Sequence, residues 1–330
     1  MKLSRLGEFA LIERIRRRTP IGRGVRLGIG DDAAWVEHPA GSSLITADLL
    51  IEDIHFNLQW TSLSDLGHKS LAVNLSDIAA MGGVPAYVIL SLGIPAHFDT
   101  KQIAQLYHGL SALAKKSRVH LVGGDTNVAK SLIISVCVIG HAPYTPVRRS
   151  GARPGDDIYV TGTLGDSALG LKYLRQRNIS AKHGPLALLL ARHHRPTPRL
   201  AAGAALARGK LATAMIDVSD GLLQDLGHIC RASGIGALIW NEQLPLSRAY
   251  RKLAGGNGTR YALSGGEDYE LLFCARPRIR GRIENLARVA RVPITKVGIC
   301  VPAKEGIVVI DSAGRQIASG TKGHDHFRKN

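Results

Sequence analysis

The feature that most constrains this chain is where its aspartates stand: beside glycine, serine or alanine, at the ends of apolar runs. Asp31 and Asp32 are adjacent at a glycine turn, before a predicted strand. Residues 44–48 form a predicted buried strand that ends on Asp48. A carboxylate at the end of such a run points into a cleft, because an unpaired charge in a core is costly. The pattern predicts a mixed α/β fold in which several segment ends supply carboxylates to a site.

The length of 330 residues predicts two domains, because one domain usually has about 150 residues. Segment 143–154, rich in arginine and proline, is the predicted boundary between domains 1–146 and 147–330. The pattern of apolar residues predicts helices over 6–18, 64–80, 100–116 and 185–194, and helices that follow 162–167 and 217–221. It predicts strands over 44–48, 86–92, 119–122, 132–139, 157–161, 212–216 and 270–274, with 232–265 irregular and carrying strand fragments.

The predicted helix 64–80 has a narrow polar stripe. Ser64 is a plausible N-cap, and Ser70, Asn74 and Asp77 follow at i, i+4 and i+7 on one face of an otherwise apolar helix. A carboxylate on a buried helix needs a partner. Asp77 is therefore a candidate site residue.

Composition excludes several classes of protein. Hydrophobic residues make up 45% of the chain and charged residues 21%, with a mean hydropathy of +0.03, which is unlike a disordered chain. No apolar run reaches the roughly 18–20 residues of a membrane span, and residues 1–19 lack the apolar stretch of a secretory signal. The four cysteines stand far apart in apolar surroundings, as expected for buried thiols. We expect a globular cytoplasmic protein.

The net charge of +17 implies attraction to nucleotides, phosphorylated substrates or nucleic acid. The basic residues are scattered, however, and aromatic residues make up only 5% of the chain, too few for a base-stacking surface. A solvated basic surface is therefore the favoured interpretation, and a nucleic-acid partner is not expected.

The familiar nucleotide and metal motifs are absent. The segment from Gly203 to Lys210 has the wrong spacing for a Walker loop, and Leu211 follows where serine or threonine belongs. There is no dinucleotide-binding glycine motif at Gly22–Gly28, no zinc helix and no serine elbow. The acidic residues remain as candidates for the site.

We consider six aspartates as one cluster: Asp31, Asp48, Asp77, Asp125, Asp217 and Asp220. Oxygen ligands without nearby cysteine or histidine favour a hard cation such as Mg²⁺, and converging carboxylates need a cation to offset their repulsion. Taken singly, an aspartate beside glycine is more often a cap or turn residue. That structural role is the interpretation for Asp32 and Asp166, and it remains open for Asp220.

The motifs taken together resemble the thiamine-monophosphate kinase family, in the superfamily of aminoimidazole-ribonucleotide synthetase and selenide, water dikinase. The resemblance spans nearly the whole chain in one order: 28–33, 46–48 with His55, 74–83, 122–127, 196–199, 217–221, 265–270 and 325–327. It implies a two-domain PurM-like fold. It also implies a homodimer in which strands of the N-terminal domain pair across the interface.

The resemblance implies transfer of the γ-phosphoryl group of ATP to thiamine monophosphate, giving thiamine diphosphate. Several Mg²⁺ ions would be held by Asp31, Thr46, Asp48, Asp77, Asp125, Asp217 and Asp220. ATP would contact Tyr107, Gly124, Asp125, Arg149 and Ser219, although Tyr107 could equally be a packing residue and Arg148 could replace Arg149. Substrate positions would be His55, Glu267, Asp268 and His324, where His324 stands in place of the family's usual aromatic residue.

The chemistry of this acceptor predicts that no general base is needed. A phosphate monoester is mostly dianionic at neutral pH, because its second pKa is about 6. The site must instead neutralise charge and align the two phosphates. Two alternatives stay open: another ATP-using enzyme of the superfamily, or a basic RNA-binding protein on a relict kinase fold.

Overall fold

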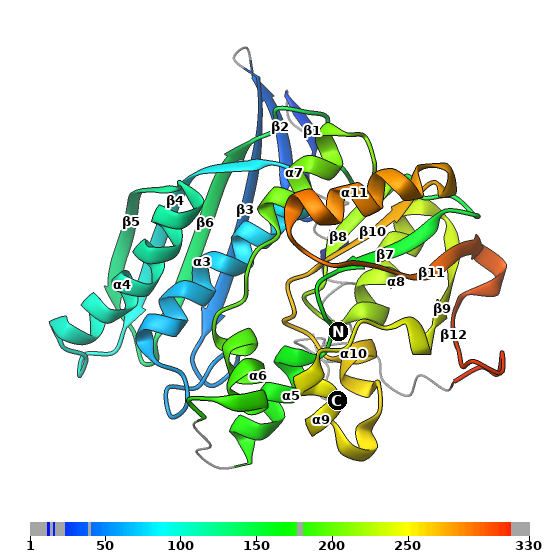
Figure 1. Ribbon diagram of the computed structural model, residues 1–330. Helices are drawn as coiled ribbons and strands as arrows, with labels where there is room; N and C mark the ends of the chain where they lie inside the picture. Colours follow the sequence, from blue (N-terminus) through cyan, green and yellow to red (C-terminus); the bar gives the residue numbers. More distant parts are fainter. Residues whose placement is uncertain (1–11, 14–15, 17–23, 39–40, 177–180, 318–330) are drawn as a thin grey trace.

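The structure is a computed structural model that describes residues 12–13, 16, 24–38, 41–176 and 181–317. It contains two six-stranded sheets, one in each half of the chain (Figure 1). The mixed α/β class predicted from sequence is confirmed. Of the predicted helix 6–18, only three residues are described, and these are helical.

The first sheet is mostly antiparallel, and only β4 and β5 pair in parallel. Its order is β1 (Val25–Leu27), β2 (Ala34–His38), β3 (Gly41–Ile51), β6 (Ile133–His141), β4 (Val84–Ile94) and β5 (His120–Val128). One face is apolar and buried, as the alternation along β6 illustrates: Ile134, Val136 and Val138 are buried while their neighbours are partly exposed.

Two long helices cover that apolar face (Figure 1). They are α3 (Leu63–Ala80) and α4 (Thr100–Ser117). Helix α3 is buried on nearly all sides, because it lies between the first sheet and the second half of the chain. The hydroxyl of Ser62 accepts the backbone N–H of Asp65, so Ser62 is the N-cap and the prediction of Ser64 was wrong by two residues.

The second sheet has helices on both faces. Its order is β12 (Ile307–Ile310), β9 (Ile235–Trp240), β11 (Ile294–Pro302), β7 (Asp157–Thr161), β10 (Leu271–Ala275) and β8 (Ala214–Asp217). Helix α8 (Leu222–Ser233) packs on one face, and α7 (Leu200–Arg208) and α11 (Arg280–Ala290) pack on the other. Strands β7, β8 and β10 are buried at every position for this reason.

The remaining helices gather at the end of the second half where the site lies (Figure 1). They are α5 (Asp166–Arg175), α6 (Gly184–His194), α9 (Arg248–Leu253) and α10 (Arg260–Ser264). Leu169, Leu189 and Tyr250 form a small core that joins α5, α6 and α9. The described residues also include four 3-10 turns: η1 (Asn241–Gln243), η2 (Gly255–Asn257), η3 (Pro277–Ile279) and η4 (Ala303–Glu305).

Two expectations about local structure were wrong. The strand predicted over 119–122 was too short, because residues 123–127 continue β5 in parallel register with β4. Residues 232–265 contain β9, in agreement with the expected strand fragments, but they are not otherwise irregular, since they also contain α9 and α10. Glycine-rich and charged stretches look like loops in sequence, but long-range strand pairing and burial override that local preference.

All four cysteines are free; Cys230, Cys274 and Cys300 are buried, whereas Cys137 is only partly so. Within the residues that the structure describes, none of the helices is both long enough and apolar enough to cross a lipid bilayer.

Candidate active site

A cavity of about 970 Å³ opens between the two halves of the chain. The first half contributes β3, the 53–60 segment and α3, and the second half contributes α5, α10 and the segments that follow β8 and precede β10. Many of the residues predicted from sequence line it: Asp48, His55, Asp77, Asp217, Ser219, Asp220 and Glu267. The cavity therefore gathers much of the predicted site.

Three carboxylates meet at this cavity: Asp32, Asp77 and Asp217 each place an oxygen within 4.8 Å of the others. Two hydroxyls hold them. Thr46 Oγ1 donates to Asp77 Oδ2 at 2.6 Å, and Ser76 Oγ donates to Asp217 Oδ2 at 2.6 Å. Strand β3, helix α3 and strand β8 thus present their side chains to one point, although they are far apart in sequence.

Burial is the largest cause of raised pKa values among the carboxylates near this point. Together with neighbouring aspartates it raises the pKa of Asp217 to about 8 and of Asp31 to about 7, and by itself it raises that of Asp48 to about 6. The pKa of Asp77 is raised well above its ordinary value for the same two reasons. Carboxylates that resist ionisation because they are buried together are the donor set that a hard divalent cation stabilises. The residues therefore fit Mg²⁺.

Arg149 lies beside the cluster and pairs with Asp32, the aspartate interpreted from sequence as a turn residue. Its guanidinium donates to both oxygens of Asp32, at 3.0 and 3.2 Å, and its backbone N–H donates to Asp31 at 3.2 Å. Arg148 is exposed. The interpretation of Asp32 as only a turn residue was wrong, because its carboxylate is buried within the cluster. Asp166 does have the structural role expected, since it accepts the hydroxyls of Thr163 and Ser247.

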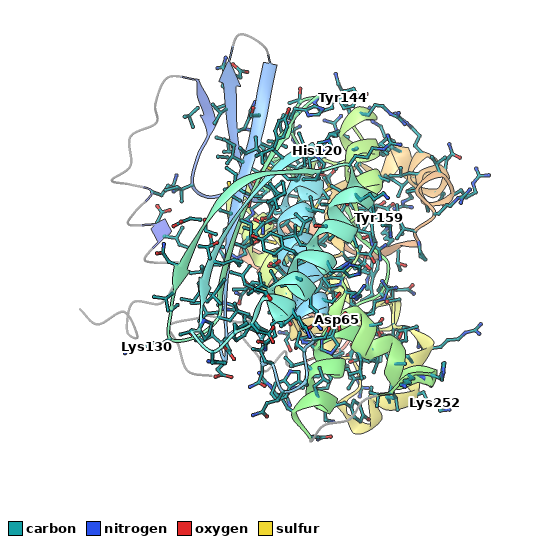
Figure 2. The ribbon with its side chains drawn as sticks, turned by 90° about the vertical axis from the view of Figure 1, so that its left-hand side faces the viewer. Asp65, His120, Lys130, Tyr144, Tyr159 and Lys252 are labelled. Atoms are coloured by element: carbon teal, nitrogen blue, oxygen red, sulfur yellow. The ribbon has the colours of Figure 1, made fainter. Side chains whose placement is uncertain are left out.

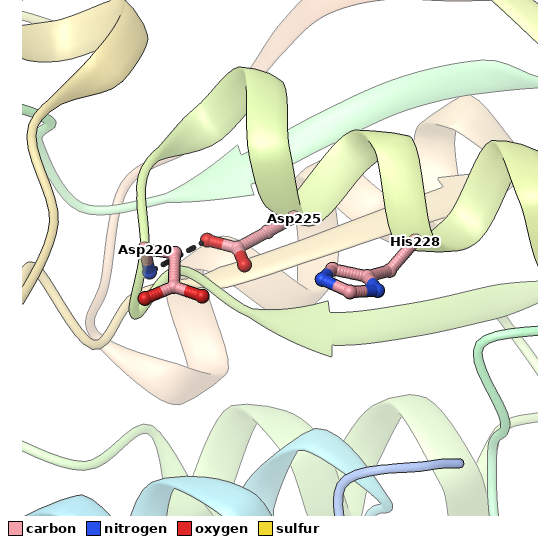
Figure 3. Close-up of side chains that lie close together, drawn as sticks. All are labelled: Asp220, Asp225 and His228. Atoms are coloured by element: carbon pink, nitrogen blue, oxygen red, sulfur yellow. Dashed lines mark hydrogen bonds between the residues drawn. The ribbon is translucent and has the colours of Figure 1, made fainter. Parts of the chain in front are cut away.

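A second acidic group lies at the start of α8 (Figure 3), where Asp220, Asp225 and His228 come within metal-binding distance of one another. The backbone N–H groups of Ser219, Asp220 and Gly221 all donate to Asp225 Oδ2, at 3.0–3.1 Å. Asp225 therefore satisfies the free donors at this helix start. Asp220 lines the cavity, and its carboxylate accepts a hydrogen bond of 3.1 Å from Gln224 Nε2.

Tyr107, Gly124 and Asp125 line a separate cavity of about 350 Å³ at the edge of the first sheet. One row of paired residues runs from this edge across the sheet: Asp125, Ser91, Ser135 and Leu49. Three strand spacings of about 4.8 Å separate the ends of the row, so Asp125 is about 14 Å from β3. Leu49 and Asp48 are adjacent on β3 and point to opposite faces. Within one chain, Asp125 is thus separated from the other five aspartates.

The predicted substrate residues have different surroundings. His55 lines the main cavity and its Nδ1 accepts the backbone N–H of Ile51 at 3.0 Å. Glu267 lines the same cavity and pairs with Lys69. Asp268 instead accepts the backbone N–H groups of Gly165 and Ser167 at the start of α5, and does not line the cavity. His324 lies outside the described residues.

Sequence reasoning missed Asp32, Ser76, Asp225 and Lys69. Asp32 had a signal, because it stands beside Asp31 at a glycine turn where either carboxylate could face the cavity. The other three had none: each depends on a contact with a distant or folded segment.

Comparisons with known proteins place this arrangement in a family. The model for the N-terminal domain of AIR synthase related proteins matches residues 30–142, and that for the C-terminal domain matches residues 153–311. The thiamine-monophosphate kinase of Salmonella typhimurium is 42% identical over 325 residues, which cover 97% of this chain and 98% of that protein. The enzyme of Bacillus subtilis is 36% identical and is covered in full.

The fold agrees with solved structures. The structure of AaThiL complexed with AMPPCP and TMP matches with a TM-score of 0.87 and 33% identity, covering 99% of both chains. The match to the thiamine-monophosphate kinase from Stenotrophomonas maltophilia has a TM-score of 0.78 and 41% identity, covering 92% of this chain and 96% of that one. The family expected from the motifs and the two-domain PurM-like fold are therefore confirmed: this chain belongs to the thiamine-monophosphate kinase family, within the AIR synthase related proteins.

Proposed function

We propose that this protein transfers the γ-phosphoryl group of ATP to thiamine monophosphate, giving thiamine diphosphate and ADP. The observation on which this rests is the meeting of Asp32, Asp77 and Asp217, from both halves of the chain, beside a cavity of about 970 Å³. The names of the relatives and the complex of AaThiL with AMPPCP and TMP support the same donor and acceptor. An ATP-consuming biosynthetic enzyme of this kind would act in the cytoplasm.

Mg²⁺ would be held by Asp48, Asp77, Asp217 and Asp220, which line the main cavity, and by the adjacent Asp31 and Asp32, with Thr46 beside Asp77. When bound, the metal offsets the charge that accumulates between two phosphate groups. The protein side chains supply the shape: α3 and the end of β8 fix the carboxylates, and Thr46 and Ser76 hold two of them in place.

No side chain is required as a general base. An oxygen of the acceptor phosphate, already ionised, attacks the γ-phosphorus, and the bond from that phosphorus to the oxygen of the leaving ADP breaks. Arg149 is held by Asp32 near the same point, and a guanidinium there would counter negative charge on the phosphates. His55 and Glu267 in the cavity remain the proposed substrate residues, together with Asp268 and His324 predicted from the resemblance.

We also propose that the active form is a homodimer built on the first sheet. Strand β5 is an edge strand, and all nine of its residues are exposed. Figure 2 shows this edge, with His120 and Lys130 near its two ends. Large apolar side chains are exposed on β3, β4 and β5, with Leu49 at 49%, Tyr87 at 48% and Val122 at 57%. Such a patch and open edge favour a second copy.

The dimer would complete the nucleotide site. Within one chain Tyr107, Gly124 and Asp125 lie across the sheet from the main cavity, so a partner subunit's copies of these residues could reach the ATP that a chain's own carboxylates hold. Tyr107 and Ser219 would then contact one nucleotide from different subunits. This arrangement accounts for why the ATP residues predicted from sequence fall into two groups.

An ADP-release assay with ATP, Mg²⁺ and thiamine monophosphate tests the function. We expect release that requires thiamine monophosphate and stops when EDTA removes the metal. Release with selenide or a carbamoyl substrate instead would indicate another enzyme of the superfamily. Absence of turnover together with salt-sensitive RNA binding would favour the polyanion-binding alternative.

A further inference from the structure

Lys69 is a buried cation beside the main cavity. It lies on α3, one turn before Val73 and two turns before Asp77, which both line that cavity. Its side chain is only 4% exposed, and its Nζ atom lies 2.7 Å from Oε1 of Glu267. A buried ammonium group is costly unless a carboxylate compensates it. The pair therefore joins α3 of the first half to the 265–269 loop of the second half.

Both carboxylate oxygens of Glu267 are engaged. Oε2 lies 3.2 Å from Nδ1 of His193, and that nitrogen is also 3.0 Å from the hydroxyl of Ser167. Burial and the nearby Lys69 lower the pKa of His193 to about 3, so the imidazole is neutral. Burial alone would raise the pKa of Glu267, but the charge of Lys69 and its hydrogen bond to the carboxylate outweigh burial and hold that pKa below its ordinary value. Glu267 is thus an ionised anchor for Lys69.

The loop that Lys69 holds has a strained backbone. Glu267 and Tyr269 have φ angles of 67° and 50°, in the left-handed region that residues other than glycine seldom adopt. Their backbone N–H groups donate to Ser219 and Val218, at 2.7 and 2.8 Å, so the loop is fastened to the segment that follows β8. A strained loop keeps its shape only where several contacts act together.

This loop also forms part of the cavity wall, through residues 265–267 and Tyr269. We propose that Lys69 is a positioning residue of the acceptor pocket: by holding Glu267 across the two halves, it fixes the 265–269 loop in the shape that receives the phosphate-bearing heterocyclic acceptor. The inference rests on the proposed function and assigns to Lys69 a part in it. Lys69 acts through Glu267 and the loop backbone, not by touching the reacting phosphates.

The test is Lys69→Met, which keeps the length of the side chain and removes the charge. We expect the KM for thiamine monophosphate to rise about tenfold or more, while kcat and the KM for ATP stay within about threefold of the wild type. A purely structural role would reduce the amount of active enzyme, and hence kcat, without separating the two KM values. Unchanged acceptor KM in folded Lys69→Met protein would overturn the proposal.

Lys69→Met leaves Glu267 without its cation, so the double variant Lys69→Met/Glu267→Gln is made beside it. The double variant removes both charges of the pair and with them most of the penalty for an unpaired buried group. It also lacks the tie between the halves, and Glu267 is itself a proposed substrate residue, so we expect the acceptor KM to rise at least as much. A folded double variant with wild-type KM would show that the tie does not position the loop.

Arg195→Gln is the matched control. Arg195 pairs with Asp65 of the same helix α3 and joins the same two halves, but it is 47% exposed and does not line the cavity. We expect its kinetics to match the wild type; an equal rise in acceptor KM would mean that any loosening between the halves has this effect, and would overturn the specific role of Lys69.

Isothermal titration calorimetry measures the dissociation constant of thiamine monophosphate for the wild type, the Lys69 variants and the Arg195→Gln control, without requiring turnover. If the wild-type protein binds thiamine monophosphate but does not phosphorylate it, the proposed function is refuted. The dissociation constants of the variants would still test whether Lys69 positions the acceptor pocket.

Discussion

Ser76 on α3 donates a hydrogen bond of 2.6 Å to Asp217 at the end of β8, so the two halves of the chain share one buried polar contact at the acidic cluster. Neither half alone can assemble the cluster, because Asp77 comes from one and Asp217 from the other. The state of this cluster, protonated or metal-bound, therefore couples the packing of the two halves to the chemistry of the site.

Replacement of Asp217 by asparagine is expected to separate stability from activity. The Asp217 pKa of about 8 means that burial disfavours its charged form. An amide can still accept the Ser76 hydroxyl but has no charge to bury, so the metal-free protein should gain about 1 kcal/mol or more of unfolding free energy at pH 8. Turnover should fall about 10³-fold or more, since a metal ligand is lost. Chemical denaturation in EDTA and the ADP assay measure the two effects.

Asp156→Asn is the control for that experiment. Asp156 is also a buried aspartate that accepts a hydroxyl, from Thr213 at 2.8 Å, but it does not line the cavity. We expect normal turnover. Loss of stability in Asp217→Asn together with normal turnover would contradict a metal-binding role.

The sequence was sufficient to find the carboxylates that end strands or stand on polar stripes of helices. Asp48 and Asp217 follow apolar runs, and Asp77 stands on an otherwise apolar helix. A carboxylate in such a position is expected to be buried, and burying its charge is costly unless it has a partner or a role in a site. Their order along the chain also identified the family.

The rest depended on contacts that no local pattern records. Residues 123–127 look like a glycine turn but form a strand because β4 offers a parallel partner. Asp268 looks like a substrate acid beside Glu267, but the left-handed backbone on both sides of it turns its carboxylate to the start of α5. Which of the adjacent residues Asp31 and Asp32 pairs with the Arg149 guanidinium likewise depends on where Arg149 lies in the folded chain.

The stability of the metal-free protein should fall as pH rises above about 7. Asp217, Asp31 and Asp48 have pKa values of about 8, 7 and 6 in the folded chain, above the ordinary 3.8. Between about pH 4 and pH 8 these carboxylates bind more protons in the folded than in the unfolded chain, whereas His193 and His228, whose pKa values are lowered to about 3, bind fewer below the ordinary histidine value of 6.5. Above about pH 7 the carboxylates dominate, so the free energy of unfolding decreases there as pH rises. Mg²⁺ competes with these protons, so the stabilisation that it provides should grow with pH.

Thermal unfolding in EDTA and in Mg²⁺, at about pH 7 and pH 8.5, checks this behaviour, because over this interval the histidines are mostly neutral in both states while Asp217 and Asp31 lose protons. A Tm in EDTA that rises over this interval would argue against buried, proton-holding carboxylates.

Asp32→Asn should impair the enzyme although sequence analysis gave this residue only a turn role. The substitution removes one of the three carboxylates that meet at the cavity and the charge that holds Arg149. We expect the Mg²⁺ concentration needed for half-maximal rate to rise about tenfold or more, with a lower kcat. Asp166→Asn is the comparison: it should cost about 1 kcal/mol of stability through its two hydroxyl contacts and leave the Mg²⁺ dependence unchanged.

Mixing two inactive variants tests whether Asp125 acts across the dimer. Asp48 lies at the main cavity and Asp125 at the far edge of the sheet, so each of Asp48→Asn and Asp125→Asn should abolish turnover without unfolding the protein. If a site combines Asp48 of one subunit with Asp125 of the other, a mixed dimer contains one intact site and one doubly altered site. Random reassociation of equal amounts makes half of the dimers mixed, so about a quarter of the wild-type activity should return. If both residues act within one subunit, every site in the mixture has a defect and activity stays absent. The same mixing with Val122→Asp added to both chains, which places a charge on the exposed strand edge, should prevent the recovery because it prevents pairing.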